Sequence, residues 1–157
     1  MIVLYVILAV IVVFLAVLLI RAAMFRPHEE LRPSGEKVEL DEEKIVKDMV
    51  EMIRCKTVSY NDESMIDKAE FKKFQDLLPK LYPKVHENCP REFVGVNGML
   101  YHWKGKKAEE PVVLMAHYDV VPVEESLWEK PAFEGIIEDG MIWGRGTLDT
   151  KGTFCGI

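Results

Sequence analysis

The sequence predicts an α/β fold, with helices packed on a mixed β-sheet and a single transmembrane helix in front of them. An uncharged apolar run opens the chain, two amphipathic stretches follow it, and short apolar runs separated by turn residues fill the remainder. Helical periodicity followed by strand-length runs is expected when helices and a sheet share one domain. We therefore expect a membrane anchor at residues 1–23, a tether at residues 24–40 and one domain at residues 41–157.

The first element is the apolar run at residues 2–20, which contains no charge, glycine or proline. As a helix it spans about 28 Å, close to the roughly 30 Å hydrocarbon core of a bilayer. A cleaved signal peptide is the competing interpretation, but it requires a basic segment before the run and a small-residue cleavage site after it. Here Arg21 follows the run directly. Basic residues follow the run and none precedes it, so the positive-inside rule predicts a single-pass membrane protein with its domain on the cytoplasmic side.

Two amphipathic helices are predicted next. Asp41 is placed to cap the first, and Pro83 ends the second. Apolar residues recur at helical spacing at Ile45, Val46, Met49, Val50 and Ile53 in the first helix and at Phe71, Phe74, Leu77, Leu78 and Leu81 in the second. No polar constellation interrupts either apolar face, so we expect both helices to serve packing.

Strands are predicted in the second half of the chain. The pair Asn97-Gly98 indicates a hairpin turn, and residues 138–140 indicate another. The expected strands lie at residues 92–96 and 99–103 in the first hairpin and at residues 133–137 and 141–143 in the second. The apolar run at residues 112–116 has the composition of a strand buried on both faces, and we expect it to be the central strand of the sheet.

His117 and Asp119 follow this run directly. Residues two apart on a strand point the same way, so the two side chains are expected to act together. A neutral imidazole is a preferred zinc ligand, and its other ring nitrogen usually donates to a carboxylate. A lone histidine of this kind is more often a hydrogen-bonded core residue, so the pair needs further support.

A glycine-rich stretch lies some 30 residues further on. Gly144 and Gly146 are free to adopt positive φ, which lets the chain turn and present Asp149. A dinucleotide-binding motif is excluded because Asp149 stands where the third glycine belongs. A P-loop is excluded because Lys151 is followed by Gly152.

Composition limits the partners. The net charge is −6, and no basic stripe is visible, which argues against nucleic acid as a partner. The three cysteines, Cys55, Cys89 and Cys155, form no C-x-x-C spacing, so the sequence predicts neither a disulfide framework nor a structural zinc site.

Three motifs together resemble the aminoacylase, acetylornithine deacetylase and carboxypeptidase S family of dinuclear-zinc metallopeptidases. They are L-M-A-H-Y-D-V-V-P at residues 114–122, W-E-K-P-A-F at residues 128–133 and D-G-M-I-W-G-R-G-T-L-D-T-K-G at residues 139–152. The resemblance implies a catalytic domain of the zinc-exopeptidase type with two Zn²⁺ ions when complete. It implies that His117 binds one zinc, that Asp149 bridges both, and that Asp119 has the catalytic role of holding the imidazole of His117.

The same resemblance implies parts that this sequence does not contain. A general base, the remaining zinc ligands and an inserted domain would lie beyond Ile157, so we expect the chain to be the N-terminal part of the catalytic domain. Such inserted domains often dimerise, which implies a homodimer through that domain. The peptide bond between Asp149 and Thr150 is expected to be cis. Glu124 and Glu125 form an acidic pair, but their position corresponds to a surface loop of the family.

The function implied by the resemblance is zinc-dependent hydrolysis of an amide bond in short peptides or N-acyl amino acids, by a carboxypeptidase or a deacylase. His117 and Asp149 cannot supply the three or four ligands that a zinc ion normally takes. The isolated 157 residues are therefore expected to bind zinc weakly and to hydrolyse little. The alternative is a non-catalytic membrane-anchored remnant or binding module.

Overall fold

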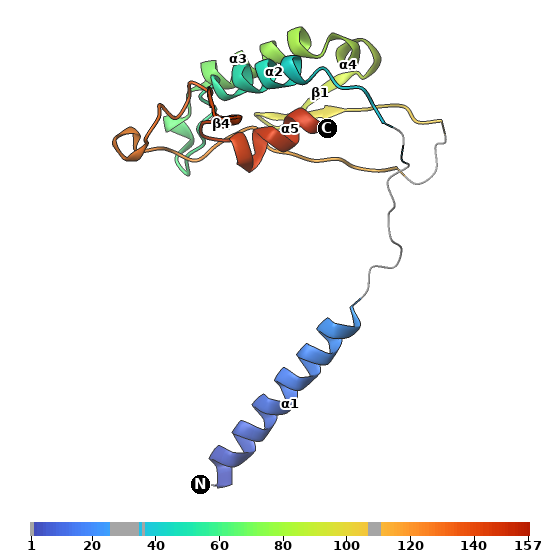
Figure 1. The fold of residues 1–157 in the computed structure, drawn as a ribbon, viewed down its shortest axis with the longest axis vertical. Helices are drawn as coiled ribbons and strands as arrows, with labels where there is room; N and C mark the ends of the chain where they lie inside the picture. Colours follow the sequence, from blue (N-terminus) through green and yellow to red (C-terminus); the bar gives the residue numbers. More distant parts are fainter. Residues whose placement is uncertain (1, 26–34, 36, 107–110) are drawn as a thin grey trace. The chain divides into compact units, whose positions relative to one another are not determined.

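The structure is a computed structural model that describes residues 2–25, 35, 37–106 and 111–157. It divides into two compact units, Met1–Glu39 and Leu40–Ile157. The first unit contains helix α1 (Ile2–Met24), which by length and composition is able to cross a membrane, although a signal sequence has the same properties (Figure 1). The predicted tether at residues 24–40 lies largely outside the described residues.

The second unit contains the two predicted amphipathic helices, α2 (Glu42–Ile53) and α3 (Lys68–Leu81). The carboxylate of Asp41 accepts a hydrogen bond from the Lys44 N–H at 3.0 Å and so caps α2, as predicted. Asp67 caps α3 in the same way through the Ala69 N–H at 2.9 Å. The same unit contains the short helices η1 (Glu63–Met65), α4 (Pro83–Asn88), which starts at the proline, and η2 (Glu125–Leu127).

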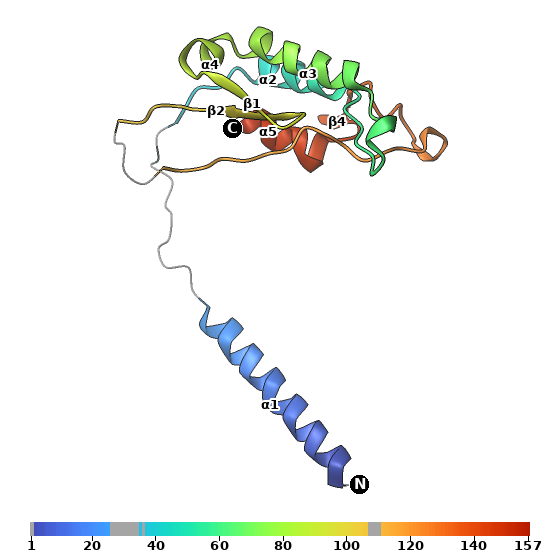
Figure 2. The same cartoon turned by 180° about the vertical axis from the view of Figure 1, so that it is seen from behind.

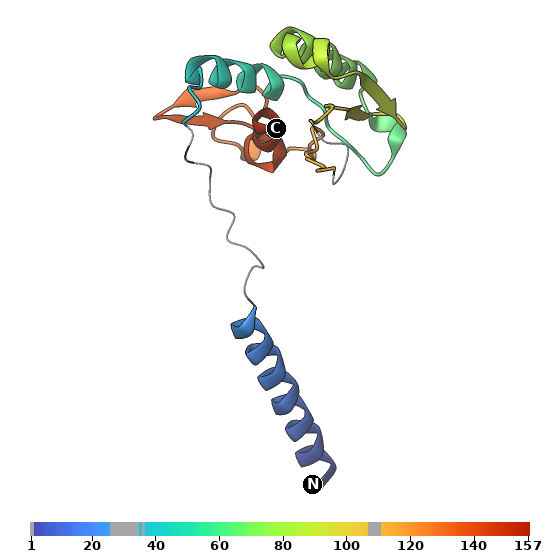
Figure 3. The same ribbon diagram turned by 90° about the vertical axis from the view of Figure 1, so that its right-hand side faces the viewer.

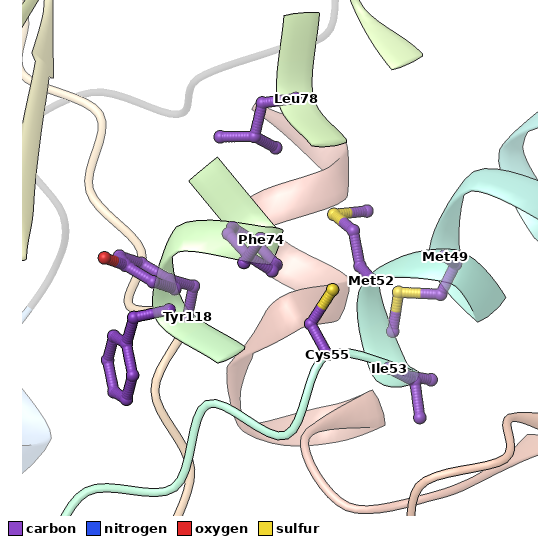
Figure 4. Packing of buried hydrophobic residues seen from close by; sticks show 8 residues of the cluster. Met49, Met52, Ile53, Cys55, Phe74, Leu78 and Tyr118 are labelled. Carbon is purple, nitrogen blue, oxygen red and sulfur yellow. The ribbon is translucent and has the colours of Figure 1, made fainter. Parts of the chain in front are cut away.

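The core of this unit lies between α2, α3 and the C-terminal helix α5 (Gly152–Gly156). Figures 1 and 2 show α2 and α3 side by side on one face of this unit, with α5 on the other face. Phe74 and Ile53 are fully buried, and the ring of Tyr118 stacks on Phe74 with centroids 4.6 Å apart (Figure 4). Tyr118 thereby fixes the segment that contains the candidate site to the helical layer.

Two antiparallel hairpins make up the β-structure: β1 (Arg91–Val94) with β2 (Gly98–Tyr101), and β3 (Ile136–Glu138) with β4 (Met141–Trp143) (Figure 3). Both hairpins were predicted, but the first turn is displaced. It occupies residues 95–97, and Gly98 pairs with Val94 inside the ladder. A Cβ on Gly98 would lie 2.5 Å from the Val94 carbonyl oxygen, so this glycine permits a close approach between strands and does not form the turn.

The prediction of a mixed sheet with residues 112–116 as its central strand is wrong for the described residues. Val112, Val113, Leu114 and Met115 are 67–83% exposed, and they belong to no strand. The described part of the chain holds only the two antiparallel hairpins and one isolated parallel bridge, between Val58 and Val120. The apolar composition requires burial on two faces, but none of the described residues supplies the neighbouring strands that would provide it.

Candidate metal centre

The segment at residues 117–119 alternates between the core and the surface. Tyr118 is 8% exposed, and its hydroxyl donates to the Asn97 carbonyl at 2.6 Å while accepting from the Gln75 side-chain amide at 3.1 Å. Because neighbouring side chains on an extended chain point to opposite sides, burying Tyr118 turns His117 and Asp119 outward together. Their side chains are 53% and 42% exposed. The predicted pairing thus arises from one anchored tyrosine rather than from a sheet.

A second segment, residues 57–59, runs beside the first. The Val120 N–H donates to the Thr57 carbonyl at 2.8 Å, and the Ser59 N–H donates to the Val120 carbonyl at 3.0 Å. The buried Thr57 hydroxyl adds a third bond, to the Tyr118 carbonyl at 2.5 Å. These bonds attach the segment directly to the chain that leaves α2.

His117 lies between two carboxylates. Its Nδ1 is 3.1 Å from Asp119 Oδ1 and 3.0 Å from the Asp119 carbonyl oxygen, and its Nε2 is 3.0 Å from Asp149 Oδ1. The structure therefore brings together the three residues that the sequence singled out. Asp149 comes from 32 positions further along the chain and is the most exposed of the three, at 87% of its side chain.

Asp149 is presented by an irregular turn, η3 (Thr147–Lys151), in which Asp149 and Thr150 have non-helical dihedral angles. The peptide bond between these two residues is cis, as the resemblance implied. The turn begins at Gly146, whose φ is +90°. The Arg145 N–H donates to the Ala132 carbonyl at 2.6 Å and holds the strand that enters the turn.

The turn ends at Lys151, a lysine with no exposed surface. Its Nζ donates to the Met52 carbonyl at 2.9 Å and to the Cys55 carbonyl at 2.7 Å, at the C-terminal end of α2. Burial lowers the pKa of Lys151 to about 8. The lysine thus ties the turn that contains Asp149 to the helix that leads into residues 57–59.

The carboxylates also change the proton affinity of the imidazole. Burial by itself lowers the pKa of His117, but the Asp119 carbonyl and the carboxylates of Asp149 and Asp119 outweigh it, so the pKa is raised above its ordinary value. A metal ion bound at Nε2 would therefore have to compete with a proton for this nitrogen.

The donor set fits part of a zinc site. A neutral histidine whose Nδ1 proton is held by a carboxylate presents a free lone pair at Nε2. Two ligand atoms on one tetrahedral zinc lie roughly 3.3 Å apart, given bonds of about 2.0 Å. The observed 3.0 Å between His117 Nε2 and Asp149 Oδ1 is close to that spacing. Among the described residues, no group of three or more His, Cys, Asp or Glu side chains is suitably placed for a metal ion.

The sequence analysis did not predict that Thr57 and Ser59 belong to this arrangement, or that Lys151 anchors it. The Ser59 hydroxyl donates to Asp119 Oδ2 at 2.6 Å, across 60 positions of sequence. A pair of hydroxyl residues just after a helix end was the only signal available.

Other candidate side chains of this unit lie outside the site. The ring nitrogens of His86 contact the Tyr82 carbonyl and the Tyr101 hydroxyl, at 2.9 and 3.0 Å. The Glu125 carboxylate accepts from the Ala132 N–H at 3.2 Å.

Replacing Gly146 by alanine is expected to lower the free energy of unfolding by about 2 kcal/mol, because the backbone adopts positive φ and the new Cβ would lie 2.7 Å from Val120 Cγ1. Urea denaturation of the full chain in detergent, followed by tryptophan fluorescence, measures this. Gly156→Ala is the matched control, since a Cβ at that position would meet no atom within 4 Å. Equal stabilities of the two variants would contradict the steric argument.

Residues 113–157 match the family model described as Peptidase family M20/M25/M40. The chain is 38% identical over 106 residues to "Probable carboxypeptidase S-like 2" of Dictyostelium discoideum, covering 65% of this chain and 20% of that protein. It is 32% identical over 154 residues to "N-fatty-acyl-amino acid synthase/hydrolase PM20D1" of Xenopus tropicalis, covering 93% and 30%. It is 39% identical over 87 residues to "Carboxypeptidase S" of Saccharomyces cerevisiae, covering 52% and 15%.

These matches, together with a His-x-Asp pair facing a second aspartate, define a member of a peptidase family. The chain belongs to the M20 family of aminoacylases and carboxypeptidases, as the motif resemblance predicted. It spans between 15% and 30% of the length of the three relatives named above.

Proposed function

We propose that this chain contributes the first part of a zinc centre to an amide hydrolase that acts on short peptides or N-acyl amino acids. The observation that supports this most directly is the position of His117, with one ring nitrogen on Asp119 and the other 3.0 Å from Asp149. A histidine that binds zinc almost always donates its other ring N–H to a carboxylate, a backbone carbonyl or water, and the contact between His117 Nδ1 and Asp119 matches this pattern.

Each of the three residues has a distinct task in this proposal. Asp119 accepts the Nδ1 proton of His117, which fixes the ring orientation and leaves the Nε2 lone pair available for a metal. His117 Nε2 and an oxygen of Asp149 are the ligands that this chain offers. A carboxylate has two oxygens, so Asp149 is suited to bridge two ions in a site of two Zn²⁺. When bound, zinc would polarise the scissile carbonyl and lower the pKa of a water molecule.

The substrate class is inferred from the chemistry that the relatives' names share. Carboxypeptidases and an N-fatty-acyl-amino acid hydrolase both cleave an amide bond to an amino acid. We propose the same bond for this chain, in a substrate with a free carboxylate next to the scissile amide. The general base and the further ligands of the site are proposed to come from outside these 157 residues.

The remaining proposals concern the setting of the site. Residues 2–20 would anchor the protein in a lipid bilayer, with residues 24–40 as the tether and the catalytic part on the cytoplasmic side. A homodimer would form through a domain outside this chain. A glycosylation tag placed after residue 40 tests the sidedness: glycosylation of the tag in the lumen would refute the cytoplasmic placement.

A non-catalytic binding module is the second candidate function. The observation that favours it is the small donor set, because only His117 and Asp149 face each other as ligands among the described residues. In that case the protein would bind zinc and a ligand without hydrolysing an amide.

The deciding experiment uses the complete product of the gene, purified in detergent. Its sequence is determined from the transcript, which is read past the codon for Ile157. Zinc content per chain is measured together with amino acid release from a panel of N-acyl amino acids and dipeptides. Chelator-sensitive hydrolysis that is lost in Asp149→Asn is the expected result. Zinc binding without hydrolysis in a folded protein would favour the binding module, and absence of both would overturn the metal centre itself.

A further inference from the structure

The contact between Ser59 and Asp119 is a feature that the proposed zinc centre leaves unexplained. The hydroxyl of Ser59 donates to Asp119 Oδ2 at 2.6 Å, while Asp119 Oδ1 is 3.1 Å from His117 Nδ1. The two oxygens of one carboxylate are thus divided between a serine and the imidazole. The 2.6 Å separation lies in the range of a charge-assisted O–H···O⁻ bond, about 2.5–2.7 Å.

We infer that Ser59 is a positioning residue of the metal centre, which acts through Asp119 to fix the orientation of His117. The terminal torsion of an aspartate is broad, so a carboxylate held at one oxygen only is free to rotate. The Ser59 bond removes that freedom by holding the second oxygen. This inference rests on the proposed function, since it assigns Ser59 a role in the same zinc centre.

Ser59 is itself held by backbone bonds, which a positioning role requires. Its N–H donates to the Val120 carbonyl at 3.0 Å, and the neighbouring Val58 pairs with Val120 in a parallel bridge. Thr57 contributes two more bonds to the same segment. The hydroxyl therefore projects from a backbone that is fixed relative to Asp119 and not from a free loop.

A nucleophilic role for Ser59 does not fit this geometry. An activated serine donates its proton to a base nitrogen, as in a Ser-His-Asp arrangement. Here the hydroxyl donates to a carboxylate, and both nitrogens of His117 already contact Asp119 and Asp149. Ser59 contacts Asp119, Asp119 contacts His117, and His117 contacts Asp149. In this series of contacts, Asp119 separates the serine from the proposed metal ligands.

The test compares the full 157-residue chain with Ser59→Ala, Ser59→Thr and Ser64→Ala in detergent. Ser64 is the matched control because its hydroxyl donates to the Asp62 carboxylate at 2.7 Å, in a helix that does not contain His117. Zinc affinity is measured by chelator competition, and the tautomer of the metal-free His117 ring is measured from its nitrogen NMR shifts. Neither measurement depends on hydrolysis.

Ser59→Ala is expected to weaken zinc binding about tenfold, the lower end of the range for partners outside the ligand set, and to lower the population of the Nδ1–H tautomer of His117, which the Asp119 carbonyl alone would then hold. Ser59→Thr, which keeps the hydroxyl, and Ser64→Ala are expected to match the original chain within about twofold. Unchanged affinity and tautomer in Ser59→Ala would overturn the inference. So would a loss of stability with an unchanged tautomer, which indicates a structural role only. If the original chain shows no zinc effect on the His117 ring, the proposed function fails instead.

Discussion

Zinc binding by the full chain is expected to fall at least about 100-fold when His117 is replaced by alanine. The change removes one of the two ligand atoms at this site, and the loss of partners outside the ligand set already costs about 10–100-fold in metal affinity. Because the His117 side chain is 53% exposed and its contacts lie at the surface, the free energy of unfolding should change by less than about 1 kcal/mol. Chelator competition and urea denaturation on the same preparation measure both quantities.

His102→Ala provides the control for this experiment. His102 is exposed, lies after β2 and has no carboxylate contact among the described residues. Its replacement should leave zinc affinity within about twofold of the original value. If His117→Ala and His102→Ala bind zinc equally well, the metal is held elsewhere and the proposed centre is wrong.

The helices and hairpins were predicted because their signals are local. Asp41 caps α2 three residues before its hydrogen-bond donor, and the apolar positions of α2 and α3 repeat within a few residues. The second hairpin turns at Asp139 and Gly140, both at positive φ, as a short Asp-Gly turn requires. The first turn was misplaced because a glycine such as Gly98 is compatible with either a turn or a close approach of two backbones. Only the pairing with Val94 distinguishes these two cases.

The central strand was wrongly predicted because burial is not a local property. Residues 112–116 have the composition of a doubly covered strand, yet the covering strands must come from other parts of a chain, and the run itself does not specify them. The exposed apolar side chains of residues 112–115 follow one another in the sequence, unlike the singly scattered apolar residues that are normal on a protein surface.

In the candidate site, too, contacts that depend on neighbouring residues were predicted and contacts between distant residues were not. His117 and Asp119 were paired correctly because the alternation of side chains needs only an extended backbone, which the burial of Tyr118 provides. Ser59 was missed because it reaches Asp119 across 60 positions of sequence. The anchoring function of Lys151 was missed for the same reason, because its partners, the carbonyls of Met52 and Cys55, lie more than 90 positions away.

The second large effect is expected at Lys151. Replacing it by alanine at pH 7 should lower the free energy of unfolding by about 3 kcal/mol, because the change leaves a cavity next to Phe74 and removes the donor to the Met52 and Cys55 carbonyls. Lys151→Met fills the cavity but leaves both carbonyls unpaired, so its loss should be smaller, about 1–2 kcal/mol. Lys47→Ala is the control, since the Lys47 side chain is 75% exposed and its loss should cost less than about 0.5 kcal/mol.

The pH dependence of these variants separates charge from packing. Burial lowers the pKa of Lys151 to about 8 from an ordinary 10.5, so between these values the unfolded chain binds the proton that the folded chain has released. This group therefore makes the original chain more stable as pH rises through that window, by at most about 3 kcal/mol. Two carbonyl acceptors favour the ammonium form, which makes the expected gain smaller. Lys151→Met lacks the group, so the stability difference between the original chain and this variant should widen from pH 8 to pH 10.5. A difference that stays constant across this window would show that Lys151 is not titrating there, and that its contribution is packing and hydrogen bonding alone.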